Sequence, residues 1–291
     1  DRCYVFAKLN PMQKKRIVDI LQQQGHTVGY MGDGINDSPP LKQADVGISV
    51  DTAVDIAKEV ADIILLEKDL QVLEDGVMEG RKTFANMNKY LKMAISGNFG
   101  NMISVLIASL ALPFLPLKPV HILVQNILND FAQFGMPYDN VEKEYIEKPM
   151  EWDTDSLKQF MFYFGLTSTV LDILCFAVLW FVFGYKTIEQ AEYFQCGWFM
   201  FGVISQTLVI HTIRTHKLPF IGGQAGRELM LSTAAVVIIT LILGLSRFAY
   251  VLDMNPLPYT YLFYLAGLMV VYLILAQIMK NIYIKRFKKW I

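Results

Sequence analysis

The chain has 291 residues, and 26 Lys and Arg against 27 Asp and Glu give it a formal charge of −1. This balance excludes a basic protein that wraps nucleic acid, so we expect no nucleic-acid partner. Hydrophobic residues make up 54% of the chain and charged residues 18%, whereas an ordinary soluble domain is about 25% charged. The composition therefore excludes a single soluble domain, a disordered chain and a fibre, and it indicates a membrane protein.

Charge is concentrated near the start of the chain, where 26 of the first 92 residues are charged, against 27 of the remaining 199. We therefore expect a cytosolic domain over residues 1–82, followed by a transmembrane domain over residues 83–291 that begins with a stalk. The first residues contain neither an initiator Met nor a signal peptide, which predicts a piece of a longer protein.

The first domain alternates short apolar runs with segments of helical spacing. Strand-length runs occur at 4–7, 27–31, 46–50 and 63–66, and helical spacing occurs at 11–24 and 54–60. Such alternation predicts an α/β domain with a parallel sheet and crossover helices. In such a domain, ligands bind beyond the carboxyl ends of the strands.

The second domain contains stretches that are long enough to cross a bilayer, which requires about 20 mostly apolar residues per helix. Five stretches qualify on this criterion: 93–115, 160–183, 196–213, 229–252 and 260–279. A sixth, 120–137, is short and carries several polar side chains, so hydropathy alone would score it weakly.

The distribution of basic residues favours the sixth span. When it is counted, the segments 138–159, 214–228 and 280–291 share one side of the membrane and carry eleven Lys and Arg. The opposite side then has only Lys118, Lys186 and Arg247. Because cytosolic loops are enriched in Lys and Arg, we predict a helical bundle of six spans with both ends of the chain in the cytosol.

A Gly-rich acidic loop directly follows the predicted strand at 27–31 and reads Gly-Asp-Gly-Ile-Asn-Asp-Ser-Pro over residues 32–39. Its glycines permit tight backbone geometry, and its carboxylates can hold Mg²⁺ beside a phosphate. Any three of these residues alone would indicate an ordinary turn. The length of the motif and its position between a strand and a helix favour a functional loop.

This motif resembles the phosphate loop of P-type ATPases and, more loosely, that of haloacid-dehalogenase-type phosphatases. The resemblance implies a partial haloacid-dehalogenase-like, or Rossmann-like, domain. It also implies that Asp33, flanked by Gly32 and Gly34, binds the catalytic Mg²⁺, with Asp37 as a second metal ligand.

The same resemblance implies that Asn36 and Asp37 help to arrange the phosphorylation site, and that Lys14 contacts the phosphoryl group. Taken alone, Lys14 would be a solvated charge on a helix. The phosphorylated Asp of the family lies in Asp-Lys-Thr-Gly-Thr, which does not occur in this chain. We therefore expect the chain by itself to be inactive, with ATP bound mainly by a part of the protein upstream of it.

Two sets of polar residues are predicted to lie on faces of the first two spans. Asn98 and Asn101 are three residues apart, and Asn126, Asn129 and Asp130 fall at i, i+3 and i+4. A cluster of five oxygen-bearing side chains on two adjacent helices suits a hard cation. Hydrogen bonding between helices is the alternative, but it accounts poorly for a carboxylate flanked by two amides.

Several segments resemble the bacterial magnesium-transporting P-type ATPases, namely those at 137–141, 197–199, 205–208, 211–215 and 219–221. Calcium pumps of the wider family carry a glutamate where this sequence has Asn101. A single carboxylate with neutral amides suits Mg²⁺, which keeps much of its water shell. The resemblance implies ATP-driven Mg²⁺ uptake across a bacterial inner membrane, where the chain contacts lipids.

Three alternatives remain open from the sequence: a pump for calcium or protons, a phosphatase domain on a membrane anchor, and a non-catalytic membrane subunit. Asp172, midway along the third span, is equally compatible with a second polar site and with a carboxyl group satisfied by neighbouring helices. The basic segment from Lys280 to Trp290 is expected to contact anionic lipid headgroups.

Overall fold

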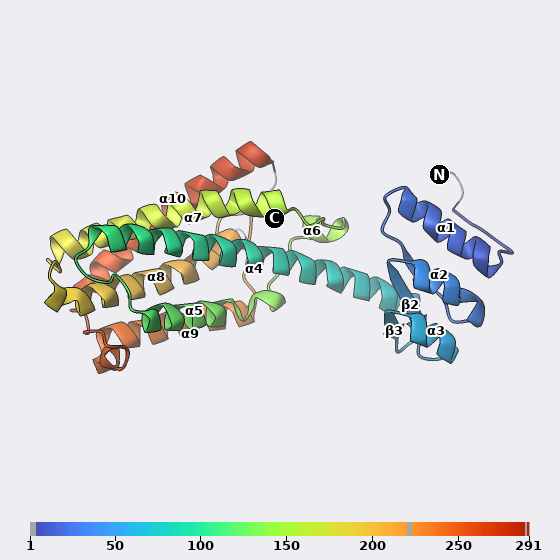
Figure 1. The fold of residues 1–291 in the computed structure, drawn as a ribbon, viewed down its shortest axis with the longest axis horizontal. Helices are drawn as coiled ribbons and strands as arrows, with labels where there is room; N and C mark the ends of the chain where they lie inside the picture. Colours follow the sequence, from blue (N-terminus) through green and yellow to red (C-terminus); the bar gives the residue numbers. More distant parts are fainter. Residues whose placement is uncertain (1–3, 220–222, 289, 291) are drawn as a thin grey trace. The chain divides into compact units, whose positions relative to one another are not determined.

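The computed structural model describes residues 4–219, 223–288 and 290. It divides into two compact units, Asp1–Gly80 and Arg81–Ile291. The first unit contains the strands and the second is helical, as the labels along the chain in Figure 1 indicate.

The first unit is built on a parallel sheet of three strands in the order β1-β2-β3. The strands are β1 (Gly29–Met31), β2 (Val46–Val50) and β3 (Ile63–Leu65), with Gly29 opposite Val46 and Ile48 opposite Ile63. Crossover helices α2 (Ser38–Gln43) and α3 (Asp55–Val60) pack on β2. The predicted parallel sheet with crossover helices is therefore present, in a small form, with its core at Leu41, Val50, Ala53 and Ala57.

Helix α1 (Pro11–Gln23) precedes the sheet and packs against α2. A capping box starts it, in which the Asn10 side chain accepts from the Gln13 N–H at 2.8 Å and the Gln13 side chain accepts from the Asn10 N–H at 3.0 Å. The strand predicted at 4–7 is not formed, and Tyr4 is 93% exposed. A strand requires a neighbouring strand to pair with, which an apolar run by itself does not indicate.

The second unit is a bundle of helices. Its long helices are α4 (Leu70–Ala111, which begins within the first unit), α5 (Pro119–Gln133), α7 (Thr154–Ala177), α8 (Ala191–Ile213), α9 (Arg227–Leu245) and α10 (Tyr261–Phe287). Shorter elements are η2 (Met136–Tyr138), α6 (Lys143–Glu147), the π-helical turn η3 (Val178–Val182), η4 (Ile188–Gln190) and η5 (Arg247–Leu252). The first unit also contains a short 3₁₀ helix, η1 (Ile35–Asp37).

Five of the described helices are long and apolar enough to cross a membrane: α4, α7 continued by η3, η4 continued by α8, α9 and α10. They correspond to the five strong predictions from hydropathy. The sixth predicted span forms α5, which has 15 residues. A helix of that length measures about 22 Å and is shorter than the hydrocarbon core of about 30 Å.

Helix α8 is the centre of the bundle and packs against α5, α7, α9 and α10. Of its most apolar segment, 83% is buried inside the protein, against 28% to 39% for the other four candidate spans. A helix that is apolar on all sides is typically a buried one. The remaining spans each leave a large apolar surface uncovered, as lipid-facing helices do.

Helices α4 and α7 approach each other closely at two glycines. A Cβ atom at Gly100 would lie 2.8 Å from the carbonyl oxygen of Gly165, and the Thr169 hydroxyl donates to the Gly100 carbonyl at 3.2 Å. Small residues allow this backbone approach in membrane helices. The crossing brings Ser104 of α4 to Asp172 of α7, where their side chains hydrogen-bond at 2.6 Å.

Two residues of the basic segment at the end of α10 do not lie where they could contact lipid headgroups, although the sequence predicted this contact. Lys280 is fully buried, and its ammonium group donates to the carbonyls of Thr212 and Lys217 at 2.9 and 2.7 Å. Trp290 is 4% exposed, and its indole donates to the Ile213 carbonyl at 3.0 Å. These two side chains therefore donate to the carbonyls of the last residues of α8, which lack partners within the helix, and to one carbonyl in the segment after it, and they do not face lipid headgroups.

Candidate functional site

The acidic loop lies at the carboxyl end of β1, where ligands of parallel sheets are typically bound. The Asp37 side chain folds back against the start of the loop, so that a Cβ atom at Gly32 would lie 2.4 Å from the Asp37 Cβ. The Gly34 N–H donates to Asp37 Oδ2 at 3.3 Å. Only glycine at position 32 leaves room for this compact turn.

Asp37 is held by two further donors from elsewhere in the unit. Lys14 Nζ of α1 lies 2.7 Å from Asp37 Oδ1, and the Tyr30 hydroxyl of β1 donates to the same oxygen at 2.8 Å. Burial alone would raise the pKa of Asp37, but the hydrogen bonds from Lys14 and Tyr30 outweigh it and hold the pKa below its usual value. The hydrogen bond to Asp37 raises the pKa of Lys14, so both groups are charged at neutral pH.

Burial, followed by the hydrogen bond to Asp37, raises the pKa of Tyr30 to about 12. The phenol is therefore protonated at neutral pH and acts as a donor. It completes a cluster in which one carboxylate oxygen receives both an ammonium and a phenol, which fixes the position of the lysine.

Asp33 has a more open environment. Its side chain is 50% exposed, and its Oδ2 pairs with Lys68 Nζ at 2.5 Å. Asn36 is also exposed. Within residues 4–219, 223–288 and 290, no group of three or more His, Cys, Asp and Glu side chains is placed to hold a metal ion. A magnesium ion at this loop would thus rely on one or two carboxylates and on water, which is a common arrangement for Mg²⁺.

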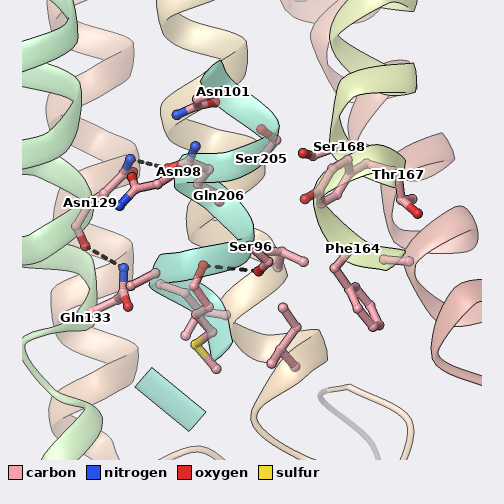
Figure 2. A pocket seen from close by; sticks show the side chains of 18 of the residues that line it. Ser96, Asn98, Asn101, Asn129, Gln133, Phe164, Thr167, Ser168, Ser205 and Gln206 are labelled. Atoms are coloured by element: carbon pink, nitrogen blue, oxygen red, sulfur yellow. Dashed lines mark hydrogen bonds between the residues drawn. The ribbon is translucent and has the colours of Figure 1, made fainter. Parts of the chain in front are cut away.

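The second unit contains a cavity of about 230 Å³ that all five predicted polar residues line. Figure 2 shows Asn98 and Asn101 on α4 and Asn129 on α5 around this space. Further polar residues lining it are Ser96, Gln133, Thr167, Ser168, Asp172, Ser205, Gln206 and Tyr272. The cavity is therefore lined by residues of α4, α5, α7, α8 and α10, more helices than the two expected.

Hydrogen bonds link the side-chain amides of the cavity, but two of their carbonyl oxygens have no donor within the described residues. The Asn129 side chain donates to the Gln206 carbonyl oxygen, and the Gln133 side chain donates to the Asn129 backbone carbonyl at 3.4 Å (Figure 2). The side-chain carbonyl oxygens of Asn129 and Gln133 are buried and accept no hydrogen bond from any described residue. A buried oxygen without a donor is costly, and it is a ready ligand for a cation or a water molecule.

Two carboxylates line the cavity. Asp130 is exposed at its edge, whereas Asp172 is 3% exposed and accepts hydrogen bonds from Ser104 and Trp198 at 2.6 and 2.8 Å. In the described part of the chain, no Lys, Arg or His lines this cavity. The cavity therefore has the oxygen ligands and the negative charge that a hard cation requires.

Sequence reasoning did not assign Gln133, Ser205 or Gln206 to the site, although all three line the cavity. A signal was present for Gln133, which continues the i, i+3, i+4 pattern one turn beyond Asn129. Ser205 and Gln206 are adjacent polar residues in the apolar helix α8, and only the packing of α8 against α5 gives them a role.

The fold and the cavity together define a helical membrane protein with an oxygen-lined cavity between its helices. A model of the family described as "Cation transporting ATPase, C-terminus" matches residues 114–282, and the chain belongs to this family. It is 51% identical over 286 residues to the Magnesium-transporting ATPase, P-type 1, of Escherichia coli K12, covering 98% of this chain and 32% of that protein.

Two further relatives are also named as cation-transporting ATPases. The Magnesium-transporting ATPase, P-type 1, of Salmonella typhimurium LT2 is 49% identical over 286 residues, again 98% of this chain and 32% of the relative. The Calcium-transporting ATPase of Bacillus subtilis is 40% identical over 136 residues, or 46% of this chain and 15% of the relative. The chain thus spans about a third of the length of the magnesium-transporting relatives.

Proposed function

We propose that the chain is the C-terminal third of a P-type ATPase that uses ATP to take up Mg²⁺ into the bacterial cytosol. The observation that carries this proposal is the cavity, whose oxygen-bearing lining includes Asn98, Asn101, Asn126, Asn129 and Asp130. Identity of about half to proteins named as magnesium-transporting ATPases supports it over nearly the whole chain.

In this proposal the first unit completes a haloacid-dehalogenase-like phosphorylation domain. Bound Mg²⁺ would neutralise charge on the transferring phosphoryl group. The half-exposed Asp33 would hold this ion in place of its surface partner Lys68. A metal ligand role for Asp37 would require it to release Lys14, so we propose that Asp37 instead orients the Lys14 ammonium toward the phosphoryl group.

Asn36 is exposed beside these groups and would contact the phosphorylated segment, which belongs to the part of the protein upstream of this chain. ATP would bind mainly to that upstream part. Gly32 and Gly34 shape the loop, because Gly32 leaves space for Asp37 and the Gly34 N–H donates to it.

In the membrane, α5 would act as a sixth, short span. When α5 is counted as a span, most Lys and Arg of the connecting segments fall on one side of the membrane, as is typical of the cytosolic side. This distribution supports a crossing by α5. Its 15 residues continue into η2, and residues 120–137 together are long enough to cross a locally thinned bilayer. Both ends of the chain would then lie in the cytosol, with the outer helices in contact with lipid.

A calcium pump is the second candidate, because a calcium-transporting relative matches part of the chain. Ca²⁺ sites take six to eight oxygen ligands with several carboxylates. Here α4 offers the neutral Asn98 and Asn101 to the cavity and α5 offers the single carboxylate Asp130. Few charged ligands suit Mg²⁺, which retains bound water.

The test is Asp130→Asn in the full-length protein reconstituted in vesicles. Asn keeps the shape of Asp and removes the charge that balances a divalent ion. We expect normal accumulation in the membrane with loss of Mg²⁺ uptake and of Mg²⁺-dependent ATPase activity. Asn98→Ala and Asn101→Ala should cause graded losses of apparent affinity, since water can replace a neutral ligand. Wild-type uptake by Asp130→Asn would exclude the site.

A further inference from the structure

His121 lies in the first turn of α5, and both nitrogens of its imidazole have partners. The side chain is fully buried. Nδ1 lies 3.2 Å from the backbone nitrogen of Lys118, the residue before α5 begins. Nε2 lies 2.7 Å from the carbonyl oxygen of Leu252, at the end of η5. The imidazole therefore joins the start of α5 to the segment between α9 and α10.

The two partners fix which nitrogen of His121 carries the proton. A backbone N–H can only donate and a carbonyl oxygen can only accept, so Nδ1 accepts from Lys118 and the Nε2–H group donates to Leu252. This arrangement is one tautomer of the neutral ring. In the charged ring both nitrogens carry a hydrogen, and the Nδ1–H group would face the Lys118 N–H without an acceptor. His121 can therefore keep both hydrogen bonds only while it is neutral.

The hydrogen bond to Nδ1 caps α5. The first N–H groups of a helix have no partners within the helix. In a capping box, the side chain at the third helical position accepts from the N–H of the residue that caps the helix. His121 occupies this third position and Lys118 is the capping residue. Loss of the hydrogen bond would therefore weaken the first turn of α5.

The later turns of α5 carry side chains of the cation cavity. Four of them line it, namely Asn126, Asn129, Asp130 and Gln133. His121 lies about 8 Å along the helix axis from Asn126, and the bond to Leu252 holds the same end of α5 against η5. A shift of the first turn therefore displaces the polar side chains that follow it.

The charged groups around His121 come from three segments that meet at this end of α5. Lys118 precedes the helix, Glu192 lies in the first turn of α8, and Asp253 follows η5. Lys118 Nζ lies 3.9 Å from Glu192 Oε1 and 3.7 Å from Asp253 Oδ2, so these charges partly offset one another. From α8 the imidazole also meets the neutral ring of Phe199, with centroids 6.5 Å apart. Within the described residues no carboxylate accepts a hydrogen bond from His121, so no ion pair compensates a charged ring for its lost bond.

We propose that His121 is a positioning residue of the cation cavity that acts through α5, and that the cavity binds its ion well only while the imidazole is neutral. Acid on the side of the membrane where α5 begins adds a proton from water to the Nδ1 lone pair. This breaks the bond from the Lys118 N–H and weakens cation binding. The proton returns to water when the pH rises. The inference rests on the proposed function, because it takes the cavity as the transport site and puts the start of α5 on the external face.

The experiment varies the pH on one face of the membrane at a time. Full-length protein is reconstituted in vesicles that contain MgCl₂, and ATP is added outside, where it reaches only molecules whose cytosolic domains face outward. In these molecules the start of α5 faces the lumen. Loss of Mg²⁺ from the lumen is followed at several lumenal Mg²⁺ concentrations, with the outer solution kept at neutral pH. The lumen is buffered between about pH 5 and pH 8, the range in which an ordinary histidine changes its charge.

His121→Gln is the decisive variant. Glutamine is one of the usual residues at this position of a capping box. Its amide offers one acceptor and one donor, as the neutral ring does, but it does not titrate. His216→Gln is the control, because it removes a histidine that follows the other end of α8, where His216 pairs with Glu142.

For the wild type we expect the apparent affinity for Mg²⁺ to fall by about fivefold from the highest to the lowest lumenal pH, the size of effect that loss of one helix cap produces. His121→Gln should match the wild type at the highest pH and should keep that affinity at the lowest. His216→Gln should show the same fall as the wild type.

The outcomes separate this inference from the proposed function. An equal fall in the wild type and in His121→Gln, or no fall in the wild type, would overturn the role of His121 and leave the transport site intact. Absence of ATP-driven Mg²⁺ loss from the lumen at every pH would overturn the proposed function and this inference with it.

A second variant keeps the proposal testable if His121→Gln does not accumulate. Asp253→Asn suits the left-handed backbone at that position, where φ is 51°. It leaves one negative charge less beside the imidazole, which makes the charged ring less favourable. The fall in affinity must then shift to lower lumenal pH, and an unshifted fall would overturn the proposal.

Discussion

The ammonium nitrogen of Lys14 lies 2.7 Å from a carboxylate oxygen of Asp37. This ion pair joins the first turn of α1 to the loop after β1, 23 residues further along the chain. The pair explains why an isolated helix lysine has a defined position in the acidic loop. It also makes the first unit sensitive to pH in a predictable direction.

We expect Lys14→Met to lower the stability of the protein at neutral pH by about 1 kcal/mol or less, because the pair is partly exposed to solvent. The lowered pKa of Asp37 means that its contribution is complete above the usual carboxyl pKa. That contribution is lost as the pH falls below about 4. Because the pKa of Lys14 is raised, Lys14 stays charged until the pH exceeds the usual pKa of a lysine side chain.

Thermal unfolding of the wild type and of Lys14→Met between pH 3 and pH 8 measures this effect. Lys15→Met, which removes the neighbouring charge, is the control and should change little. A difference between wild type and Lys14→Met that is as large at pH 3 as at pH 7 would contradict the ion-pair explanation.

Asp33→Asn should slow formation of the phosphorylated enzyme by at least about 100-fold, because the proposed Mg²⁺ ion loses its charged ligand and metal stabilisation is worth several kcal/mol. The measurement is incorporation of labelled phosphate from ATP into the full-length protein. Lys68→Met is the matched control, since it removes the partner of Asp33 and keeps the carboxylate. Normal phosphorylation of Asp33→Asn would refute the assignment.

Gly100→Ala should destabilise the bundle by about 1–3 kcal/mol through overpacking. Its new methyl group would lie 2.0 Å from the Ser168 hydroxyl and 2.8 Å from the Gly165 carbonyl. At Gly267 on α10, no atom lies within 4 Å of an added Cβ, so Gly267→Ala should be neutral or slightly stabilising. Thermal unfolding in detergent measures the stability of both variants. Equal changes in stability would contradict a close backbone contact between α4 and α7 at Gly100.

Reporter fusions test whether α5 crosses the membrane. With six spans, fusions at Lys118, Lys186 and Asn255 should report an external location, and fusions at Glu147 and Ile291 a cytosolic one. The expectation follows from the asymmetry of Lys and Arg. A cytosolic signal at Lys118 would remove the second span, and Asp130 could not then contribute to a site within the membrane.

Local patterns in the sequence were sufficient for much of this structure. Apolar length predicted five membrane helices, and alternating apolar runs predicted the parallel sheet. The spacing of Asn98 and Asn101 correctly put them on one helix face, and both line the cavity. These inferences succeed because helix and strand periodicity depend on residues close together in the chain.

Only the tertiary structure decided the partners of side chains that are distant in sequence. Asp172 was ambiguous because its two donors, Ser104 and Trp198, are 68 and 26 residues away. Lys280 was expected at the lipid surface, but it is buried, and it donates to one carbonyl at the end of α8 and to one in the segment after it. The composition of this chain determined that it enters a membrane, whereas the packing of α4, α7 and α8 determined which polar groups share a cavity, because contacts between helices are set by shape and not by periodicity.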